Sequence, residues 1–421
     1  MVAKVVLAVL MVLAVLALAL QQQLMARTST LRERLQHMPE QVAGAVSVVA
    51  TAAGVAGAPT TPHVGQADHS SSTTGTGTGA VTIPHLLTPP PSPPRPPPPP
   101  MPAPDGCPRP RRPYHVLLTA ASGIYQEWQT RIAYYHYKKL KAQNPCSDIG
   151  GFTRLLNTHG ARPDALVSEI PTVVVRQLSG GRCDECDHGF IVMNRPFGIR
   201  QFVSHAAFRN ITEDYLFIVE TDHLLLKPLP NSASETQPVG FGFYYMTYRY
   251  DPPKLRPVVA KYHDPDAVDP VGPSPVVISK RMLQRVIEPW WQLCLTLKRD
   301  PQADRAFGWV LEMWAWALAT ARLGIRHEVN KQLQAEPGGV GISYLDNYFI
   351  YHYTFDIDVP AGWTGRQERY FWSKRRFMGS YPGPLPAAPS AAQRSTHSFV
   401  KIMNEAMLSF GAAWAPPRRW P

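Results

Sequence analysis

The chain reads Asp214-Tyr-Leu-Phe-Ile-Val-Glu220-Thr221-Asp222-His223 in the stretch that decides its fold class. The apolar run predicts a buried strand, which ends abruptly in two carboxylates spaced i, i+2. Side chains at these two positions of an extended segment point the same way, so Glu220 and Asp222 can face one ion. Ligands of open α/β sheets bind beyond the carboxyl ends of the strands. The stretch therefore predicts a ligand site at the edge of an α/β sheet.

The two carboxylates favour a metal site, because oxygen ligands beside a diphosphate suit a hard cation such as Mn²⁺ or Mg²⁺. Such a cation would neutralise the leaving diphosphate of a nucleotide-sugar, which is the chemistry of the Asp-x-Asp motif in glycosyltransferases of the A-type fold. Acidic pairs after strands are also common in ordinary turns, so this signal is weak alone. His352, within Tyr351-His352-Tyr353, is a candidate to complete the metal ligands; the alternative is a structural histidine between two tyrosines.

Strand-like and helix-like segments alternate on both sides of this stretch. The segments expected to be strands are 115–119, 172–175, 215–219, 241–246 and 349–353, and those expected to be helices are 124–141, 281–297 and 305–322. Alternation of this kind predicts a mostly parallel α/β sheet covered by helices on both faces. The head formed by these segments is expected to begin at Tyr114 and to end near Phe377.

Two further residues are candidates for seating a nucleotide. Thr119 lies at the end of the first expected strand, where the base of a nucleotide would lie. Arg154 follows the glycine turn in Gly150-Gly151-Phe-Thr-Arg154 and offers one cation to a phosphate or a base. Taken alone, the same five residues are as typical of a plain turn into a strand.

Glu312 lies in an apolar helix, Phe307-Gly-Trp-Val-Leu-Glu312-Met-Trp. A buried carboxylate there is costly unless it is paired or functional. Three interpretations follow: a role at the reacting sugar, a structural pair with Arg305 or another cation, and a solvated helix face. Asp304, just before this helix, reads first as an N-cap, with donor binding as the alternative.

The N-terminus predicts entry into the secretory pathway. It runs without a charge from Val5 to Met25, and its apolar part, 5–20, is close to the shortest length that spans a bilayer core, about 17 residues. We expect an uncleaved anchor over residues 1–25. A cleaved signal peptide is the alternative, since Ala17-Leu18-Ala19 resembles a cleavage site.

Composition places a stem between the anchor and the head. The chain has 44 prolines among 421 residues, and 16 of the 30 residues in 84–113 are proline. This segment predicts a stiff polyproline II rod, so residues 26–113 are expected to hold the head away from a membrane. A ligand for proline-binding domains and a glycosylated tract are the alternatives. The head is then expected over 114–377, followed by a loosely ordered Pro/Ala-rich tail over 378–421.

Cysteine content and charge further limit the compartment and the partners that we expect for this protein. Five cysteines suit an oxidising lumen, and Cys183-Asp-Glu-Cys186 favours a loop disulfide or unpaired thiols over a zinc site, because no second pair follows it. Asn210-Ile-Thr212 is an N-glycosylation sequon if the head is lumenal. The formal net charge of +11 comes without long basic runs, so we expect a field that attracts a nucleotide-sugar and no nucleic-acid binding.

A series of sequence blocks in one order resembles the plant and algal hydroxyproline O-arabinosyltransferases. The blocks are His115-Val-Leu-Leu-Thr-Ala120, Tyr134-Tyr135 with Tyr137-Lys-Lys139, Ser147-Asp-Ile-Gly-Gly-Phe-Thr-Arg154, Asp164-Ala-Leu with Glu169-Ile-Pro-Thr-Val173, Asn194-Arg-Pro196, Glu220-Thr-Asp-His223, Asp269-Pro-Val-Gly-Pro-Ser-Pro-Val-Val-Ile-Ser-Lys280, Ala306-Phe-Gly-Trp-Val-Leu-Glu-Met313 and Ile350-Tyr-His-Tyr-Thr354. Thr221 stands where the family pattern usually has proline, and the Cys183/Cys186 insertion and the long stem also depart from that pattern.

The resemblance implies a single-pass type II Golgi membrane enzyme with a lumenal head of the GT-A type. Such an enzyme moves L-arabinofuranose from UDP-β-L-arabinofuranose onto hydroxyproline of secreted or cell-wall proteins, with retention of configuration. The implied metal ligands are Glu220, Asp222 and His352, and the expected cation is Mn²⁺. Thr119 and Arg154, together with Asp222, are the implied contacts of the UDP-sugar.

Retention of the configuration at the anomeric carbon leaves the role of Glu312 open. The leaving phosphate of a retaining enzyme can take the acceptor proton, so no general base is required and Glu312 is only a candidate catalytic residue. A hydroxyproline-rich acceptor would be a polyproline II strand, and aromatic grooves commonly hold such strands. Tyr244, Tyr245 and Trp290 are candidates for this groove. Trp309 and Trp316 are seven residues apart on one helix face, so core packing is favoured for them over a sugar platform.

Two other functions stay open at the level of sequence. The peptidyl-serine α-galactosyltransferases of algae and plants resemble the same family, so UDP-galactose is an alternative donor. A non-catalytic wall- or membrane-associated protein, whose proline-rich segment is the active part, is the alternative from a different class. It predicts a head without affinity for metal or nucleotide.

Overall fold

The computed structural model describes residues 107, 110–337, 345–360 and 369–416, which belong to one compact unit, 100–421. The predicted anchor and most of the predicted stem lie outside these residues, so both stay predictions. Within the described ranges, no helix combines the length and the apolar character that a membrane span requires.

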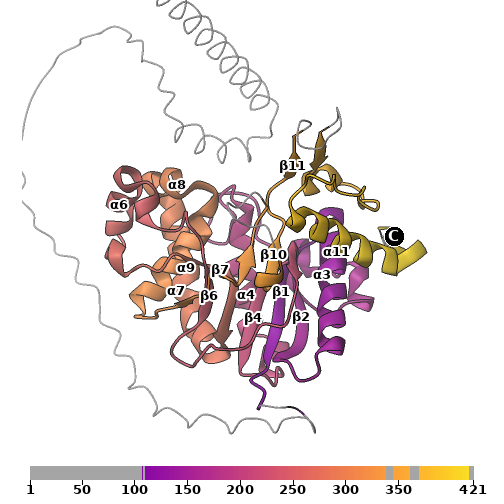
Figure 1. Cartoon of the computed structure of the whole chain (residues 1–421). Helices are drawn as coiled ribbons and strands as arrows, with labels where there is room; N and C mark the ends of the chain where they lie inside the picture. Colours follow the sequence, from indigo (N-terminus) through magenta and orange to yellow (C-terminus); the bar gives the residue numbers. More distant parts are fainter. Residues whose placement is uncertain (1–106, 108–109, 338–344, 361–368, 417–421) are drawn as a thin grey trace, which may run out of the picture. The chain divides into compact units, whose positions relative to one another are not determined.

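A central sheet organises the head (Figure 1). Its strand order is β3-β2-β1-β4-β7-β6-β8. The strands are β1 (Tyr114–Ala121), β2 (Ile149–Thr158), β3 (Thr172–Arg176), β4 (Tyr215–Glu220), β6 (Val239–Gly242), β7 (Val271–Ser279) and β8 (Glu328–Val329). Strands β1 to β4 pair in parallel, β7 is antiparallel to both β4 and β6, and β8 is parallel to β6. The prediction of a mostly parallel α/β sheet is confirmed.

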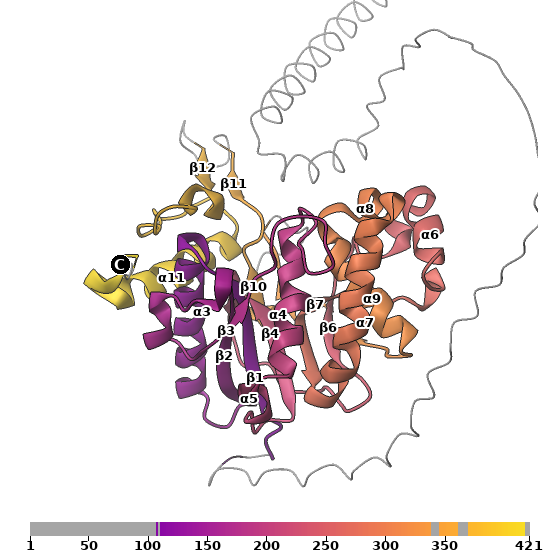
Figure 2. The same cartoon turned by 180° about the vertical axis from the view of Figure 1, so that it is seen from behind.

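Helices cover both faces of this sheet (Figures 1 and 2). Alternate side chains of β4 point to opposite faces: Leu216 and Ile218 enter one buried cluster, and Phe217 and Val219 enter the other. A strand that is buried on both faces reads as the continuous apolar run seen in the sequence. The first cluster includes side chains of α4 (Asn194–Val203), α7 (Lys280–Arg299) and α9 (Leu311–Arg322), and the second includes α3 (Ile124–Gln143). The other α-helices of the described residues are α5 (Ala206–Arg209), α6 (Pro252–Ala260), α8 (Pro301–Phe307) and α11 (Arg394–Phe410).

Two small sheets extend from the carboxyl edge of the central one. The first has the order β5-β10-β9 and is formed by β5 (His223–Leu225), β9 (Gln334–Ala335) and β10 (Ile350–His352). Strand β10 is antiparallel to β5, with His352 opposite His223. The second is the antiparallel pair β11 (Ile357–Val359) and β12 (Tyr370–Trp372). These short strands bring residues near 352 and 372 to the end of β4.

The C-terminal region differs from the expected loosely ordered tail. Helix α11 buries Phe399, Met403 and Ala406, which recur at i, i+4 and i+7 along one face. This face joins a cluster that contains Trp128 of α3, and Lys139 of α3 pairs with a glutamate of α11. The Pro/Ala-rich composition of the segment before α11 hid this amphipathic pattern.

For Cys183 and Cys186 the sequence left two alternatives open, a loop disulfide and unpaired thiols, and the structure has the disulfide. Cys183 and Cys186 form a loop disulfide, and a second disulfide joins Cys107 to Cys146. Cys294 is free and buried in the core.

Candidate functional site

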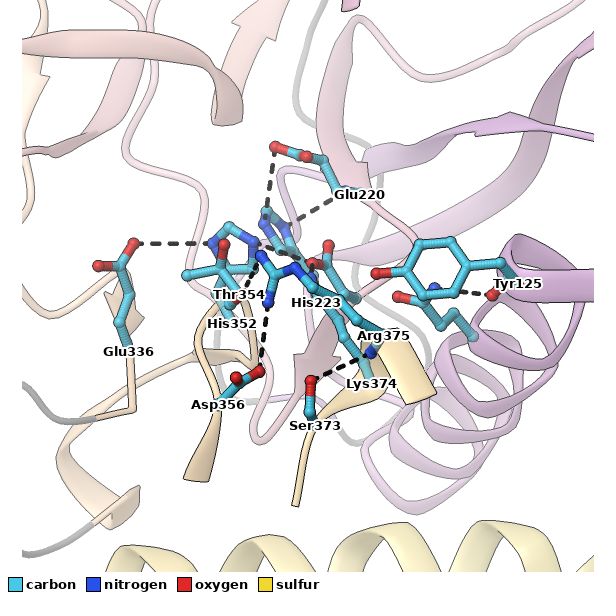
Figure 3. Close-up of polar contacts among 12 residues, drawn as sticks. Tyr125, Glu220, His223, Glu336, His352, Thr354, Asp356, Ser373, Lys374 and Arg375 are labelled. Carbon is cyan, nitrogen blue, oxygen red and sulfur yellow. Dashed lines mark hydrogen bonds and ion pairs between the residues drawn. The ribbon is translucent and has the colours of Figure 1, made fainter. Parts of the chain in front are cut away.

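The side chains of Asp222, His223, His352 and Lys374 converge where β4 ends at the carboxyl edge of the sheet (Figure 3). Strand β4 ends at Glu220, and a two-residue turn places Asp222 directly before β5. The pairing of β5 with β10 then sets the ring of His352 against that of His223, with 4.5 Å between the ring centroids. Nε2 of His352 lies 3.2 Å from Oδ2 of Asp222. Lys374 completes this group through a contact between its ammonium and the same carboxylate oxygen.

Asp222, His223 and His352 form a set of potential metal ligands. One ligand atom from each of the three lies within 4.8 Å of the others. All three side chains are buried, and Nε2 of His223 makes no hydrogen bond to any described residue. Two imidazoles and one carboxylate are a suitable donor set for a divalent first-row transition metal. These three side chains could hold a metal ion, which would displace the Lys374 ammonium from the Asp222 carboxylate.

Two of the three metal ligands predicted from the sequence, Asp222 and His352, belong to the set that the structure brings together. Asp222 and His352 are brought together as expected, although their binding of a metal stays a prediction. Glu220 turns to one side, where Oε2 accepts a 2.7 Å ion pair from Arg195 and Oε1 lies 3.9 Å from Nε2 of His223. Sequence reasoning missed His223, even though it directly follows the acidic pair, because its orientation depends on the β5–β10 pairing.

Opposite charges set the protonation of this cluster. Burial alone would raise the pKa of Asp222, but the Lys374 ammonium and the His352 imidazole outweigh burial and hold that pKa well below its usual range. Burial would lower the pKa of His352, and the Asp222 carboxylate reverses this and raises it. Burial and the neighbouring His352 hold the pKa of His223 well below its usual range. His223 is therefore neutral at physiological pH, which is the form that binds metals.

Lys374 reaches the cluster from a distant part of the chain. It begins a short 3-10 helix, Lys374–Phe377, directly after β12. Arg375 fixes this turn, because its guanidinium contacts Oδ1 of Asp356 and the carbonyl of Thr354, each at 3.3 Å (Figure 3). In the sequence, Lys374 was visible only as part of a short basic run, and no local pattern linked it to Asp222.

A second carboxylate lies on the other side of His352. Oε1 of Glu336 is 3.7 Å from Nδ1 of His352 (Figure 3). The same oxygen accepts a 2.9 Å hydrogen bond from Nε2 of Gln334. Glu336 is buried, and burial raises its pKa although the charge of His352 opposes that rise. Nδ1 of His352 makes no hydrogen bond to a described residue, so Glu336 acts on this ring through its charge and not through a hydrogen bond.

Glu312 lies behind the cluster and is completely buried. Its Oε2 is 3.3 Å from Nη1 of Arg195, and Oε1 makes no hydrogen bond to a described residue. Of the three interpretations, the structure supports a pair with a cation, and the cation is Arg195 instead of Arg305. Burial raises the pKa of Glu312 to about 7, with Arg195 opposing the rise. Arg195 thus joins Glu312 to Glu220 through one guanidinium.

The two residues expected to seat a nucleotide lie in different surroundings. Thr119 is buried at the carboxyl end of β1, opposite Glu220 in the strand register, and its hydroxyl donates to the carbonyl of Val219 at 3.3 Å. Arg154 is buried in the middle of β2, where it donates to both carboxylate oxygens of Asp164 at 2.9 and 2.6 Å. Both contacts with a nucleotide stay predictions, but Arg154 already has a carboxylate partner.

Other candidates divide between core and surface. Trp316 and Trp290 are fully buried, so core packing is confirmed for Trp316 and a groove role is wrong for Trp290. Trp309 is 53% exposed and does not belong to the core. Asp304 is not the N-cap: the helix begins earlier, at Pro301, and Asp300 caps it by accepting from the backbone N–H of Gln302 at 2.8 Å.

Comparison with known proteins identifies the family of this head. Residues 114–329 match the model of the hydroxyproline O-arabinosyltransferase family N-terminal domain. The chain is 39% identical over 302 residues to hydroxyproline O-arabinosyltransferase PLENTY of Lotus japonicus, covering 70% of this chain and 79% of the relative. It is 40% identical over 303 residues to hydroxyproline O-arabinosyltransferase 3 of Arabidopsis thaliana, covering 70% and 80%.

More distant similarities are weaker. A peptidyl serine alpha-galactosyltransferase of Arabidopsis thaliana is 26% identical over 295 residues, covering 66% of this chain and 34% of the relative. The crystal structure of the galactosyltransferase LgtC aligns over 69% of this chain and 95% of its own with 11% identity, and its TM-score of 0.37 is too low to support an argument. The family match and the long alignments are decisive by themselves. This chain belongs to the hydroxyproline O-arabinosyltransferase family of glycosyltransferases.

Proposed function

We propose that this protein transfers L-arabinofuranose from UDP-β-L-arabinofuranose to the hydroxyl of 4-hydroxyproline in secreted or cell-wall proteins. The observation that carries the proposal is the 39–40% identity to hydroxyproline O-arabinosyltransferases over 70% of the chain. The buried cluster at the carboxyl edge of the sheet supports it, because donor sites of α/β enzymes lie at that edge. We further infer that the head is of the GT-A type.

The cluster would hold a divalent cation, for which Mn²⁺ is our choice. Asp222, His223 and His352 supply the donor atoms, and the cation when bound would neutralise negative charge on the leaving diphosphate. Glu336 lies 3.7 Å from Nδ1 of His352, and Arg195 holds Glu220 at the border of the site. With the cation bound, these residues would form the surface against which the diphosphate of the donor binds.

The chemical step exchanges one bond of the anomeric carbon. The bond from that carbon to the β-phosphate oxygen breaks, a bond to the hydroxyproline oxygen forms, and the hydroxyl proton goes to the leaving phosphate to give UDP. Glu312 does not act as the base in this proposal, because Arg195 stands between it and the edge of the site. Its place in the structure suits orientation of Arg195.

We also propose a single-pass type II Golgi membrane protein, with residues 1–25 as anchor and 26–113 as stem. The Cys107–Cys146 disulfide supports a lumenal head, since structural disulfides persist in oxidising compartments. Protease protection of the head in sealed microsomes is the expected result. A mature N-terminus that begins after residue 19 would instead identify a cleaved signal peptide.

The decisive experiment compares donors and acceptors with the full chain in detergent-solubilised membranes. We expect arabinose transfer from UDP-arabinofuranose to a hydroxyproline-rich peptide, and no transfer to the matched proline peptide, which lacks the hydroxyl. Transfer from UDP-galactose to serine would replace the proposed activity with that of the more distant galactosyltransferase. Absence of transfer with both donors and several divalent metals from a folded protein would overturn the enzymatic proposal.

A further inference from the structure

The order of the strands places a tyrosine-rich segment, 243–250, at the edge of the sheet where Asp222, His223 and His352 lie. Strand β7 is antiparallel to both β4 and β6, so β4 and β6 run in the same direction and end at the same edge. One strand separates them in the sheet order. The chain leaves β6 at Gly242 and continues directly as Phe243-Tyr244-Tyr245.

Three tyrosine rings of this segment lie against one another. The ring of Tyr244 meets that of Tyr245 edge-on at a centroid distance of 5.1 Å and that of Tyr250 at 5.7 Å. Tyr244 is 69% exposed and Tyr250 is 46% exposed, whereas Tyr245 is partly buried and contacts the core residue Phe243. We call Tyr244, Tyr245 and Tyr250 the tyrosine strip. Single exposed aromatic residues need no explanation, but contiguous ones mark interaction sites.

The backbone that carries the strip is fixed from behind. Tyr248 is buried and donates a 2.7 Å hydrogen bond to Oδ1 of Asp266. The guanidinium groups of Arg249 and Arg256 lie over the ring of Tyr248 at 4.8 and 4.7 Å. Such support holds the exposed rings in place before a ligand arrives, which lowers the entropic cost of binding.

The strip lies at the same edge of the sheet as the cluster, and carboxylates of that region affect its tyrosines. Burial raises the pKa of Tyr245, and the carboxylates of Glu336 and Glu220 raise it further. The pKa of Tyr244 is raised by burial, by Tyr250 and by Glu336. Residues on both sides of the candidate metal ligands are therefore electrostatic neighbours of the strip.

We propose that the tyrosine strip binds the peptide that flanks the acceptor residue, an inference that rests on the proposed function. A hydroxyproline-rich peptide forms a polyproline II helix with three residues per turn and a rise of about 3.1 Å per residue. Its pyrrolidine rings form rigid, uncharged ridges that pack on aromatic surfaces. The exposed, uncharged rings of Tyr244 and Tyr250 match this chemistry, and they follow a strand that ends at the same edge of the sheet as β4, which leads into the cluster.

The test compares a long and a short acceptor. The Tyr244→Ala/Tyr250→Ala protein is assayed with a hydroxyproline-rich decapeptide and with N-acetyl-hydroxyproline methylamide, which cannot span the strip. We expect KM for the decapeptide to rise on the order of tenfold, since two aromatic contacts are lost. The kcat/KM of the short acceptor and the KM of the donor should stay unchanged. Tyr244→Phe retains the ring and should behave as wild type, as should Leu408→Ala, which removes an exposed apolar side chain of α11.

A direct binding measurement keeps this inference separate from the activity. Fluorescence polarisation of a labelled hydroxyproline-rich peptide should detect binding to wild type and weaker binding to the double alanine variant, whether or not arabinose is transferred. Wild-type activity with equal KM in both proteins would overturn the strip and leave the proposed function intact. An equal fall of kcat/KM for the long and the short acceptor in the double alanine variant would also overturn it, because the strip would then act on the reacting residue itself. Absence of peptide binding to wild type would overturn it independently of catalysis.

Discussion

At the scale of single residues, Arg195 is the link between the edge of the site and the core. Its guanidinium binds Glu220 at 2.7 Å and Glu312 at 3.3 Å. Burying charge is costly unless it is paired, so removal of the cation leaves two carboxylates without compensation. We therefore infer that Glu312 acts on the site through Arg195, as a positioning residue.

This arrangement predicts unequal effects of two substitutions. Glu312→Gln keeps the shape of the side chain and a hydrogen bond to Arg195, so kcat should fall by less than about tenfold. Arg195→Met removes the link and should lower kcat by about a hundredfold or more, because a buried pair that loses one partner costs several kcal/mol. The measurement is steady-state transfer of arabinose to a hydroxyproline peptide. Complete inactivation by Glu312→Gln in a folded protein would instead make Glu312 a catalytic residue.

Glu312 also predicts how stability depends on pH. Its pKa is about 7 in the folded protein against an ordinary value of 4.5, so the folded state holds the proton more tightly. Its contribution to stability is complete below pH 4.5 and is lost as pH rises to about 7, by about 3 kcal/mol. Glu312→Gln does not ionise, so its free energy of unfolding should increase relative to wild type between pH 5 and 7.5. Urea unfolding at several pH values measures this difference, and a difference that is constant with pH would contradict it.

At the scale of elements, short strands and a late helix assemble the site. Strands β5 and β10 place His223 opposite His352, and the turn after β12 supplies Lys374. Helix α11 supports β10 and β12. The ring of its Phe399 lies 5.5 Å from that of Tyr351 in β10 and 5.0 Å from that of Trp372 in β12. The C-terminal helix is therefore part of the head.

Helix α11 yields a prediction about stability and activity together. Phe399→Ala should reduce the free energy of unfolding by about 3–5 kcal/mol, since it leaves a cavity against Tyr351 and Trp372. Transfer activity should fall with it, because Tyr351 precedes the candidate ligand His352. Leu408→Ala on the exposed face of the same helix is the matched control and should change stability by no more than about 0.5 kcal/mol. If both variants unfold alike, α11 does not support the head.

The elements also explain which parts of the structure the sequence can predict. The apolar run before Glu220 and the alternation of segments identify the sheet, because local pattern alone determines them. The contacts of Lys374 with Asp222 and of Arg195 with Glu312 join residues that are far apart in the chain, and no local pattern encodes such pairs. The spacing of residues 399, 403 and 406 predicts the amphipathic face of α11. The proline-rich composition of the preceding segment instead favours a loosely ordered tail.

At the scale of the whole molecule, the described head gathers its functional groups at one edge and is tied at its start by a disulfide. Cys107 lies at the beginning of the described residues, and Cys146 lies shortly after α3. The bond therefore joins the end of the predicted stem to the head. The sequence separation of 39 residues makes it a larger constraint than the Cys183–Cys186 bond, which spans three.

This difference predicts the effect of removing each disulfide. Cys107→Ser/Cys146→Ser should lose about 4 kcal/mol of stability, because the unfolded chain regains the freedom that the longer loop removes. Cys183→Ser/Cys186→Ser should lose clearly less. Thermal unfolding of the two double variants beside wild type provides the comparison. A larger loss from the shorter loop would show that Cys183 and Cys186 stabilise the native loop directly.

The most direct test of the account measures Mn²⁺-dependent arabinose transfer to a hydroxyproline peptide by wild type and by two single variants. His223→Asn should abolish transfer, because the structure places His223 with Asp222 and His352 in the ligand set. Glu220→Gln should retain much of the transfer and show a near-normal requirement for Mn²⁺, because Glu220 is bound by Arg195. Transfer that survives in His223→Asn but is lost in Glu220→Gln would contradict the account and restore the ligand set expected from the sequence.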